Sequence, residues 1–194
     1  MNEMTTPHSS LSISNDEAFK KILANARRLA DDSRLLISNE RTYSAIMLAI
    51  FAIEEFGKAL IGRWGVRNLG NNRAYPTHIE KQSATFALLA ANEIDQLQAE
   101  KFQEIRDAGG GFHETGPLSS QFAFARSGFF DNFRMAVTYA DQNPKLPIDE
   151  AADVIDVEVA AEMLEWLELA IKSTDNDSSM ALAAIIYEND LGRL

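Results

Sequence analysis

The sequence contains no cysteine among its 194 residues, which excludes disulfide bonds, thiolate catalysis and cysteine-based zinc or iron–sulfur sites. It also lacks a long apolar run, since the longest one, Ala45 to Ile53, has only 9 residues. A helix that crosses a bilayer needs about 20 apolar residues, so we expect no membrane span. Residues 1–14 show no cationic stretch followed by an apolar one, which predicts a short polar tail rather than a secretory signal. Together these absences predict a protein of the reducing cytoplasm.

Histidine is also scarce. The chain has only three, His8, His78 and His113, and none of them follows a glutamate at a distance of three residues. A di-iron carboxylate bundle needs a Glu-x-x-His pair on each of two helices. We therefore expect neither a metal ion nor another cofactor.

Basic residues are fewer than acidic ones: the chain has 18 lysines and arginines and 29 aspartates and glutamates, which gives a net charge of −11. Residues 1–97 carry 11 basic and 11 acidic side chains, whereas residues 98–194 carry 7 and 18. A groove that tracks a nucleic-acid backbone needs a continuous basic surface, so only a small, local phosphate site is compatible with this balance. The acidic half predicts a solubility surface or a docking face for a basic partner.

Strand signals are scarce, and apolar residues recur at helical spacing in five windows, which predicts an all-α protein. Capping boxes at Ser14–Glu17 and Thr77–Glu80 mark two of the helix starts. The first connection, 38–41, is short, so the first two helices should form an antiparallel hairpin. The expected helices span approximately residues 15–37, 42–63, 77–106, 119–140 and 157–172.

We expect three regions along the chain: the tail 1–14, a helical domain 15–172 and a C-terminal segment 173–194. The C-terminal segment holds a polar linker and the apolar run Met180 to Ile186, which is either a short docking helix or a partner-binding tail. The fourth expected helix is rich in phenylalanine. We interpret these rings as core or as a helix-pair interface rather than as a stacking platform for bases.

The second helix is apolar on all sides, yet it contains the charged residues Glu54, Glu55 and Lys58. A buried charge without a partner is costly, so each must be paired. Glu54 and Lys58 are four residues apart in the favourable order, which predicts an ion pair between them. Glu55 lies about 100° round the helix and needs another partner. Gly57, in mid-helix, would let another backbone or a ligand approach closely.

His78 and Lys81 stand three residues apart at the start of the third helix, so they are neighbours on one face. The charged residues of the second and third helices allow two interpretations. They form either a polar network that fixes helix pairing or a functional site.

Four short segments combine into a recognisable pattern. They are NARRL at 25–29 followed by Asp31-Asp32, the helix 45–58 ending in AIEEFGK, the pair His78-x-x-Lys81, and RMAVTYAD at 134–141. In this combination the chain resembles the AbiV-type abortive-infection family of the HEPN superfamily, over residues 15–172. The Glu-Glu-x-Gly-Lys helix is the most specific part of the resemblance.

The resemblance implies a HEPN-like antiparallel helical bundle that pairs as a homodimer and acts in bacterial defence against phage. Many HEPN proteins are metal-independent endoribonucleases that use an arginine followed a few residues later by a histidine at the dimer interface. Here Arg134 is followed at the fifth position by Tyr139. This departure from the pattern leaves catalysis open.

Cleavage of RNA without a metal requires a base, a cation and an acid around the scissile phosphate. Arg134 suits the cationic role and Tyr139 can donate a proton, whereas His78 can act as the base only if its helix packs against that of Arg134. The expected catalytic residues are Arg134, Tyr139, Glu55, Lys58 and His78, with Glu54, Lys81 and Asp141 in support.

Three interpretations follow from the sequence. The chain is a HEPN-type ribonuclease with a small RNA site, or a non-catalytic module of the same fold that binds and inhibits a phage or host protein. In the third, it is a plain helical dimerisation domain whose charged residues are structural. We favour a defence protein.

Overall fold

The computed structural model describes residues 15–65, 75–96, 117–138 and 155–191. Within these ranges the chain forms helices and no strand, which confirms the all-α class. No helix in them is both long and apolar enough to cross a membrane. The helices are α1 (Asn15–Ile37), α2 (Thr42–Trp64), α3 (His78–Gln96), α5 (Pro117–Arg126), α6 (Phe129–Thr138), α8 (Val157–Ser173) and α9 (Asp177–Leu191).

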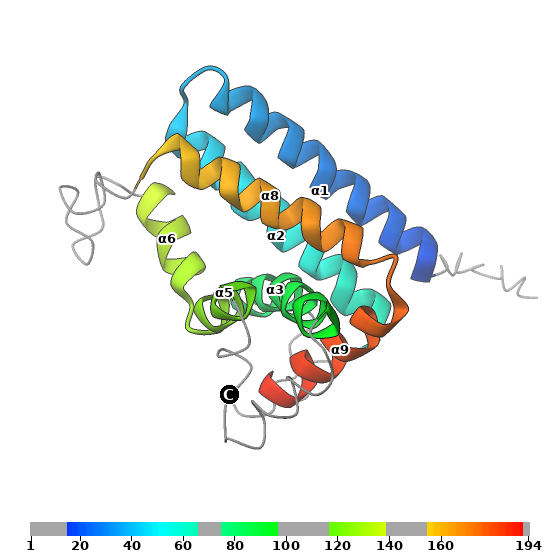
Figure 1. Ribbon diagram of the computed structural model, residues 1–194. Helices are drawn as coiled ribbons and strands as arrows, with labels where there is room; N and C mark the ends of the chain where they lie inside the picture. The colour runs from blue at the N-terminus through cyan, green and yellow to red at the C-terminus, as the bar shows by residue number, and fades with distance from the viewer. Residues whose placement is uncertain (1–14, 66–74, 97–116, 139–154, 192–194) are drawn as a thin grey trace, which may run out of the picture.

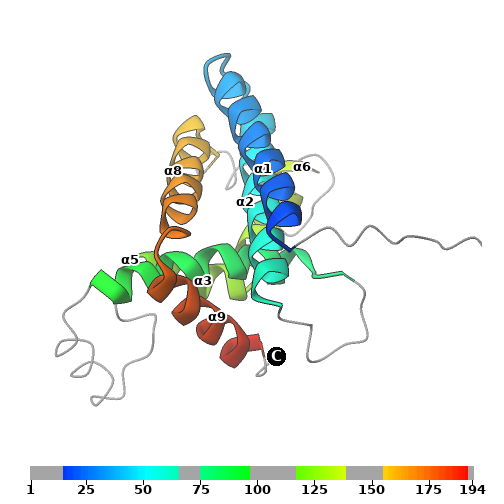
Figure 2. The ribbon, with the colours of Figure 1, turned by 90° about the vertical axis from the view of Figure 1, so that its right-hand side faces the viewer.

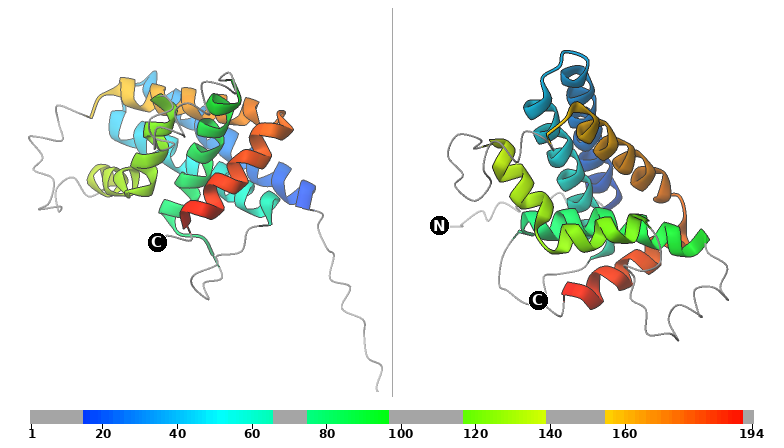
Figure 3. Two further views of the ribbon diagram at one scale, coloured as in Figure 1. Left: turned by 60° about the horizontal axis from the view of Figure 1, so that its bottom comes forward. Right: turned by 60° about the vertical axis from the view of Figure 1, so that its left-hand side comes forward.

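Three long helices, α1, α2 and α8, lie alongside one another, and α3 and α5 cross beneath them (Figures 1 and 2). The helix α9 covers the far side of α3, and α6 turns from the end of α5 back towards α2 (Figure 3). The helix α2 contacts α1, α3, α6 and α8, and twelve of its residues are buried. Its all-round apolar sequence is therefore explained by a central position in the bundle.

The hairpin of α1 and α2 forms as the sequence predicts. Both helices begin where expected. The helix α2 ends at Trp64 and is followed by Gly65, whose φ of 67° is the left-handed conformation common after a helix. The buried hydroxyl of Ser33 donates a hydrogen bond to the carbonyl oxygen of Ala45 at 2.7 Å, which ties the two helices together.

The single helix expected at 119–140 is two helices in the structure, α5 and α6. The break falls at Ser127-Gly128, where Gly128 has a φ of 79°. Its carbonyl oxygen then accepts the first hydrogen bond of α6, from the Asn132 backbone N–H at 2.9 Å. The prediction of one continuous helix is wrong because apolar spacing continues across the break, while a single left-handed glycine turns the chain.

The apolar run Met180 to Ile186 lies within α9, which packs on α3. Ala183, Ile186 and Tyr187 are at most 1% exposed. The run was expected to be either a short docking helix or a partner-binding tail, and in the structure it is a helix docked on α3.

Asp95, near the end of α3, holds the start of α9. Its carboxylate oxygens accept hydrogen bonds from Asn176 Nδ2 and Ser178 Oγ, both at 2.8 Å. These hydrogen bonds hold the pKa of the Asp95 carboxyl below its ordinary value, because they stabilise the charged form. These two hydrogen bonds fix the start of α9, directly after α8, against the end of α3.

Several expectations lie outside the described residues. They are the Ser14 capping box, the continuation of the third helix beyond Gln96, and the side chains of Tyr139 and Asp141. The prediction of a helix near 157–172 is confirmed by α8.

Candidate functional site

The buried carboxylate of Glu54, whose side chain is only 4% exposed, is the centre of a polar cluster between α2, α3 and α6. Its Oε2 lies 2.6 Å from His78 Nδ1 and accepts a hydrogen bond from Lys81 Nζ at 3.3 Å. Its Oε1 accepts a hydrogen bond from Gln82 Nε2 at 2.9 Å and lies 3.9 Å from Arg134 Nε. Both oxygens are thus satisfied, as a buried carboxylate requires.

The helix α3 supplies His78, Lys81 and Gln82 from one face, because residues three and four apart share a side of a helix. A reciprocal capping box fixes where this face begins. The backbone N–H of Thr77 donates to Glu80 Oε2 at 2.5 Å, and the Glu80 N–H donates to Thr77 Oγ1 at 3.2 Å. This predicted capping box is confirmed, and it makes His78 the first residue of α3.

Gly57 sets the distance between α2 and α3. A Cβ atom at this position would lie 1.7 Å from the carbonyl oxygen of Lys81, which no side chain can occupy. Nearby, Thr85 Oγ1 donates a hydrogen bond to the carbonyl oxygen of Ile53 at 2.9 Å. The prediction that Gly57 admits another backbone is confirmed, and this close approach brings the α3 side chains within reach of Glu54.

Arg134 comes from α6 and is only 15% exposed. Its Nη2 and Nε donate to Asp131 Oδ1 at 2.7 and 3.2 Å, so Asp131 orients the guanidinium beside Glu54. The turn at Gly128 is what aims α6 towards α2. The sequence analysis did not predict this turn. It therefore identified Arg134 as a candidate site residue but not the packing of α6 that brings Arg134 beside Glu54.

Two members of the cluster were missed from the sequence, Gln82 and Asp131. Each carried a local signal, because Gln82 stands four residues after His78 and Asp131 three residues before Arg134. The full set, which we call the Glu54 cluster, is Glu54, His78, Lys81, Gln82, Asp131 and Arg134.

The predicted ion pair between Glu54 and Lys58 is wrong. Lys58 Nζ instead lies 3.2 and 3.3 Å from the two carboxylate oxygens of Glu55. Glu55 also accepts a hydrogen bond from Asn25 Nδ2 of α1 at 3.1 Å. The reason is the tertiary structure, because α3 brings His78, Lys81 and Gln82 to Glu54 and α6 brings Arg134, four nitrogen-bearing side chains in place of one local lysine. We call Glu55, Lys58 and Asn25 the Glu55 group.

The sequence predicted Glu55, Lys58, His78 and Arg134 as members of one site. The structure brings His78 and Arg134 together on Glu54, whereas Glu55 bonds to Asn25 of α1 and Lys58 pairs with Glu55.

The chemistry available to the Glu54 cluster follows from its charges. The two carboxylates, Glu54 and Asp131, are balanced by Lys81 and Arg134, and the half-exposed imidazole of His78 adds a group that can accept or donate a proton. The Nε2 atom of His78 makes no hydrogen bond within the described residues. Among the residues that the structure covers, no group of three or more His, Cys, Asp or Glu side chains is arranged to hold a metal ion. The cluster therefore offers one proton-transfer group beside two cations.

Comparison with known proteins gives one match. A HEPN-type family model with the description AbiV matches residues 16–171. No curated protein and no solved structure matches the chain significantly.

Proposed function

The chain belongs to the AbiV family of HEPN-type abortive-infection proteins, and from this premise we propose that it acts in defence against phage by cleaving RNA at the Glu54 cluster. One observation carries the proposal: His78 and Arg134, from helices far apart in the sequence, both lie against the same buried carboxylate. The motif position where many HEPN nucleases have a histidine holds Tyr139, and His78 of α3 can take that role.

The proposed reaction needs no group beyond this chain and the RNA. His78 Nε2 takes the proton of a ribose 2′-hydroxyl, and the 2′-oxygen attacks the adjacent phosphorus. Arg134 and Lys81 stabilise the charge on the phosphorane. The bond from phosphorus to the 5′-oxygen then breaks, and an acid protonates that oxygen. The products are a 2′,3′-cyclic phosphate and a 5′-hydroxyl.

Glu54 serves as a positioning residue in this scheme. Its hydrogen bond to Nδ1 leaves Nε2 to act on the RNA, and its charge stabilises the imidazolium that forms after proton transfer. Tyr139 stays the proposed proton donor to the leaving oxygen, with Asp141 in support, on the basis of the sequence alone. We assign Glu55 and Lys58 a role in holding α1 against α2.

The test is cleavage of a labelled RNA by the purified full chain in excess EDTA. We expect cyclic-phosphate ends from the wild type and a loss of about 100-fold or more in rate for His78→Gln, the usual size of a general-base effect. Arg134→Met should lose a similar factor. The matched control is Glu188→Gln on α9, an exposed position, which should cleave at the wild-type rate.

Circular dichroism of each variant separates loss of chemistry from loss of fold. Wild-type cleavage no faster than that of His78→Gln would overturn the ribonuclease proposal. A well-folded Glu55→Gln or Lys58→Met variant with the same loss as His78→Gln would return these residues to the catalytic set.

The alternative function is a non-catalytic module that binds a phage or host protein, and the specific observation in its favour is Tyr139 at the expected histidine position. It predicts that the chain protects cells from phage while His78→Gln protects them equally well. Protection lost in His78→Gln, with RNA cleavage lost in parallel, would reject this alternative.

We also propose that two copies pair, as the resemblance implies. Support comes from an exposed aromatic pair on α5 and α6, where Phe124 and Phe129 are each 48% exposed with ring centroids 5.4 Å apart. Exposed apolar side chains that lie together are typical of interfaces. Sedimentation equilibrium should give a dimer for the wild type and a weaker one for Phe124→Ser. A monomeric wild type at all concentrations would contradict the pairing.

A further inference from the structure

Tyr75, just before α3, is the most exposed of the large hydrophobic and aromatic side chains that the structure describes, at 81%. Within the described residues its ring contacts no other ring and no cation, and its hydroxyl forms no hydrogen bond. Contact between an aromatic ring and another flat or apolar group is favourable. The ring therefore offers a binding surface that the fold itself does not use.

The backbone that carries Tyr75 is held by the residues that follow it. Pro76 comes next, and a residue before a proline is restricted to extended conformations. Thr77 forms the capping box with Glu80, and its carbonyl oxygen accepts a hydrogen bond from the Lys81 backbone N–H at 3.1 Å. These contacts tie the segment to the first turns of α3. Less conformational entropy is therefore lost when the ring binds a partner.

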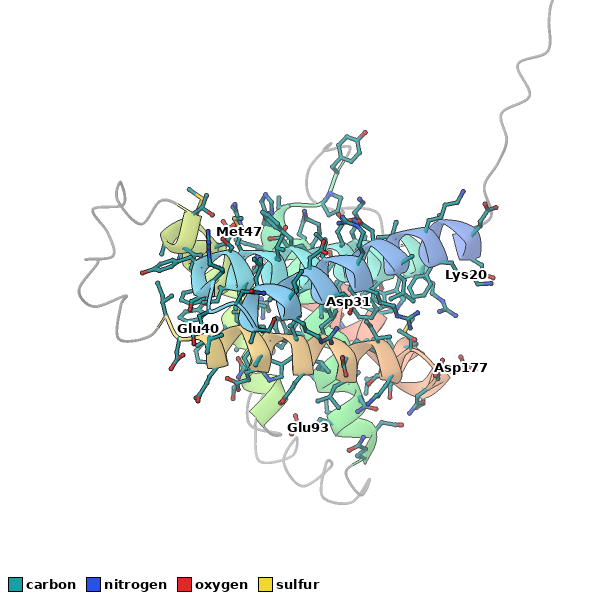
Figure 4. All side chains as sticks on the ribbon, turned by 90° about the horizontal axis from the view of Figure 1, so that it is seen from above. Lys20, Asp31, Glu40, Met47, Glu93 and Asp177 are labelled. Atoms are coloured by element: carbon teal, nitrogen blue, oxygen red, sulfur yellow. The ribbon has the colours of Figure 1, made fainter. Side chains whose placement is uncertain are left out.

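Tyr75 lies at the end of α3 that contributes His78 to the Glu54 cluster. Glu93, labelled in Figure 4, marks the opposite end of this helix. His78 follows Tyr75 by three residues, and three residues span at most about 11 Å even when fully extended. The His78 side chain is 46% exposed, so a ligand can reach it from solvent. An RNA strand that contacts His78 thus has the Tyr75 ring close by.

The charge of the Glu54 cluster is too small to hold an RNA strand by electrostatic attraction alone. Its cations Lys81 and Arg134 are paired with the carboxylates of Glu54 and Asp131. The chain as a whole has a net charge of −11, which repels a polyanion. Stacking of a base on an aromatic ring does not depend on charge, and every base has a flat face for it. An RNA site at this place therefore needs a contact of the kind that Tyr75 offers.

From these features we propose that the Tyr75 ring stacks on an unpaired base next to the scissile phosphate, which makes single-stranded RNA the substrate class of the Glu54 cluster. This inference rests on the function proposed above. A base within a duplex is covered on both faces, so it reaches the ring only after leaving the stack, at a cost in free energy. Tyr75 takes no part in making or breaking bonds. It is a binding residue that raises affinity and leaves the chemical step unchanged.

The first test is binding of the full chain to a 2′-O-methyl oligouridylate that carries one 2-aminopurine at its centre. The methyl groups prevent cleavage, and the fluorescence of 2-aminopurine falls when this base stacks on a ring. We expect the wild type to quench the fluorescence, and Tyr75→Ser to bind about 10-fold more weakly without quenching. Tyr75→Phe keeps the ring and should retain both the affinity and the quenching.

The matched control is Tyr43→Ser, which removes another exposed tyrosine at the start of α2. This residue lies about 16 Å from Glu54 along the helix axis, so its loss should leave binding and quenching as in the wild type.

The second test is cleavage of the unmodified RNA. Tyr75→Ser should raise KM by about 10-fold and change kcat by less than about twofold, because the stacked base contributes equally to the bound substrate and to the transition state. His78→Gln should instead lower kcat. The wild type should cleave the single strand faster than the same strand annealed to its complement.

The two tests separate failure of this inference from failure of the proposed function. If the wild type cleaves RNA and a folded Tyr75→Ser variant keeps the wild-type KM, the stacking role is overturned and the ribonuclease stands. If Tyr75→Ser loses binding and quenching but the wild type cleaves nothing, the base contact stands and the cleavage is overturned. No binding of the 2′-O-methyl strand by the wild type at about 1 mM would overturn the stacking role, as would equal affinity for the duplex.

Discussion

Glu54 and Glu55 are adjacent in the sequence and identical in chemistry, yet the structure gives them different surroundings. The Glu54 side chain is 4% exposed and is held by side chains from α3 and α6. The Glu55 side chain is 24% exposed and is held by Lys58 on its own helix and by Asn25 on α1. A rotation of about 100° per residue sends the two carboxylates to different neighbours of α2.

The difference between the two glutamates shows that the Glu54 cluster depends on the packing of several helices, whereas the pairing of Glu55 with Lys58 is local. Glu54 is satisfied only when three helices are in place, and a buried charge that loses its partners is expensive. Glu55 keeps a partner three residues away and contact with water, where an ion pair contributes little. Three comparisons test this contrast and a fourth tests a buried polar group without a partner, from the largest expected effect to the smallest.

The largest effect is expected from Gly57→Ala. The added Cβ would meet the Lys81 carbonyl oxygen at 1.7 Å, so α3 must move away from α2 and from Glu54. We expect a loss of about 3 kcal/mol in the free energy of unfolding, the upper end for overpacking. The matched control is Gly62→Ala, because nothing lies within 4 Å of its Cβ. That change should stabilise the helix by about 0.5 to 1 kcal/mol. Equal urea midpoints for the two variants would contradict the close approach.

The next change compares the glutamates directly. Glu54→Gln leaves Lys81 without its buried counter-charge and removes one of the two carboxylates beside Arg134, so it should cost about 2 to 3 kcal/mol. Glu55→Gln should cost less than about 1 kcal/mol, because its side chain is part-exposed and Lys58 can turn to water. Urea unfolding followed by circular dichroism measures both. Equal losses would show that the two environments do not differ in energy.

Lys81 and Lys58, the lysine partners of Glu54 and Glu55, should differ in the same direction but with smaller effects on stability. Lys81 is 16% exposed and Lys58 is 44% exposed. Lys81→Met should cost about 1 to 2 kcal/mol, and Lys58→Met about 0.5 kcal/mol or less. Raising NaCl from about 0.05 to 0.5 M should remove the Lys58 effect, which is screened, and leave most of the Lys81 effect. If the stability loss of Lys81→Met disappears at high salt, the ion pair between Lys81 and Glu54 is exposed to solvent rather than buried.

The smallest effect is expected at Tyr187, a buried polar group without a partner. Its ring is 1% exposed and its hydroxyl makes no hydrogen bond within the described residues. Tyr187→Phe removes an unsatisfied group, so stability should stay unchanged or rise by about 1 kcal/mol. A loss above about 1 kcal/mol would reveal a hydrogen bond at the hydroxyl.

The same residue gives a pH dependence. Burial, together with the charge of Glu80, raises the pKa of Tyr187 above its ordinary value. The folded state therefore holds the proton that the unfolded chain releases near pH 10, so this contribution is present below about pH 10 and falls as the pH rises further. Urea titrations at about pH 8 and pH 10.5 should show a larger loss for the wild type than for Tyr187→Phe.

Local signals predicted much of the fold. The ends of α1, the start of α2 and the position of α8 follow from caps and apolar spacing, which depend on neighbouring residues alone. The break at Gly128 was missed because a single glycine in a helical pattern is ambiguous until the left-handed conformation is seen.

The candidate site was predicted in part. The sequence identified Glu54, His78 and Lys81 by residue type and helix position, Arg134 by the family resemblance of 134–141, and Gly57 by its place in mid-helix. The sequence analysis paired Glu54 with Lys58 because the spacing rule that it used applies only to residues on the same helix.

The sequence by itself determined the helical class, most helix positions and the room for a close approach at Gly57, because each of these depends on residues within a few turns. Only the tertiary structure decided which carboxylate becomes buried and which cations meet it. The partners of Glu54 on α3 lie at least 24 residues away. Their meeting is set by the packing of α3 and α6 on α2, which buries apolar area and leaves Glu54, not Glu55, in the contact.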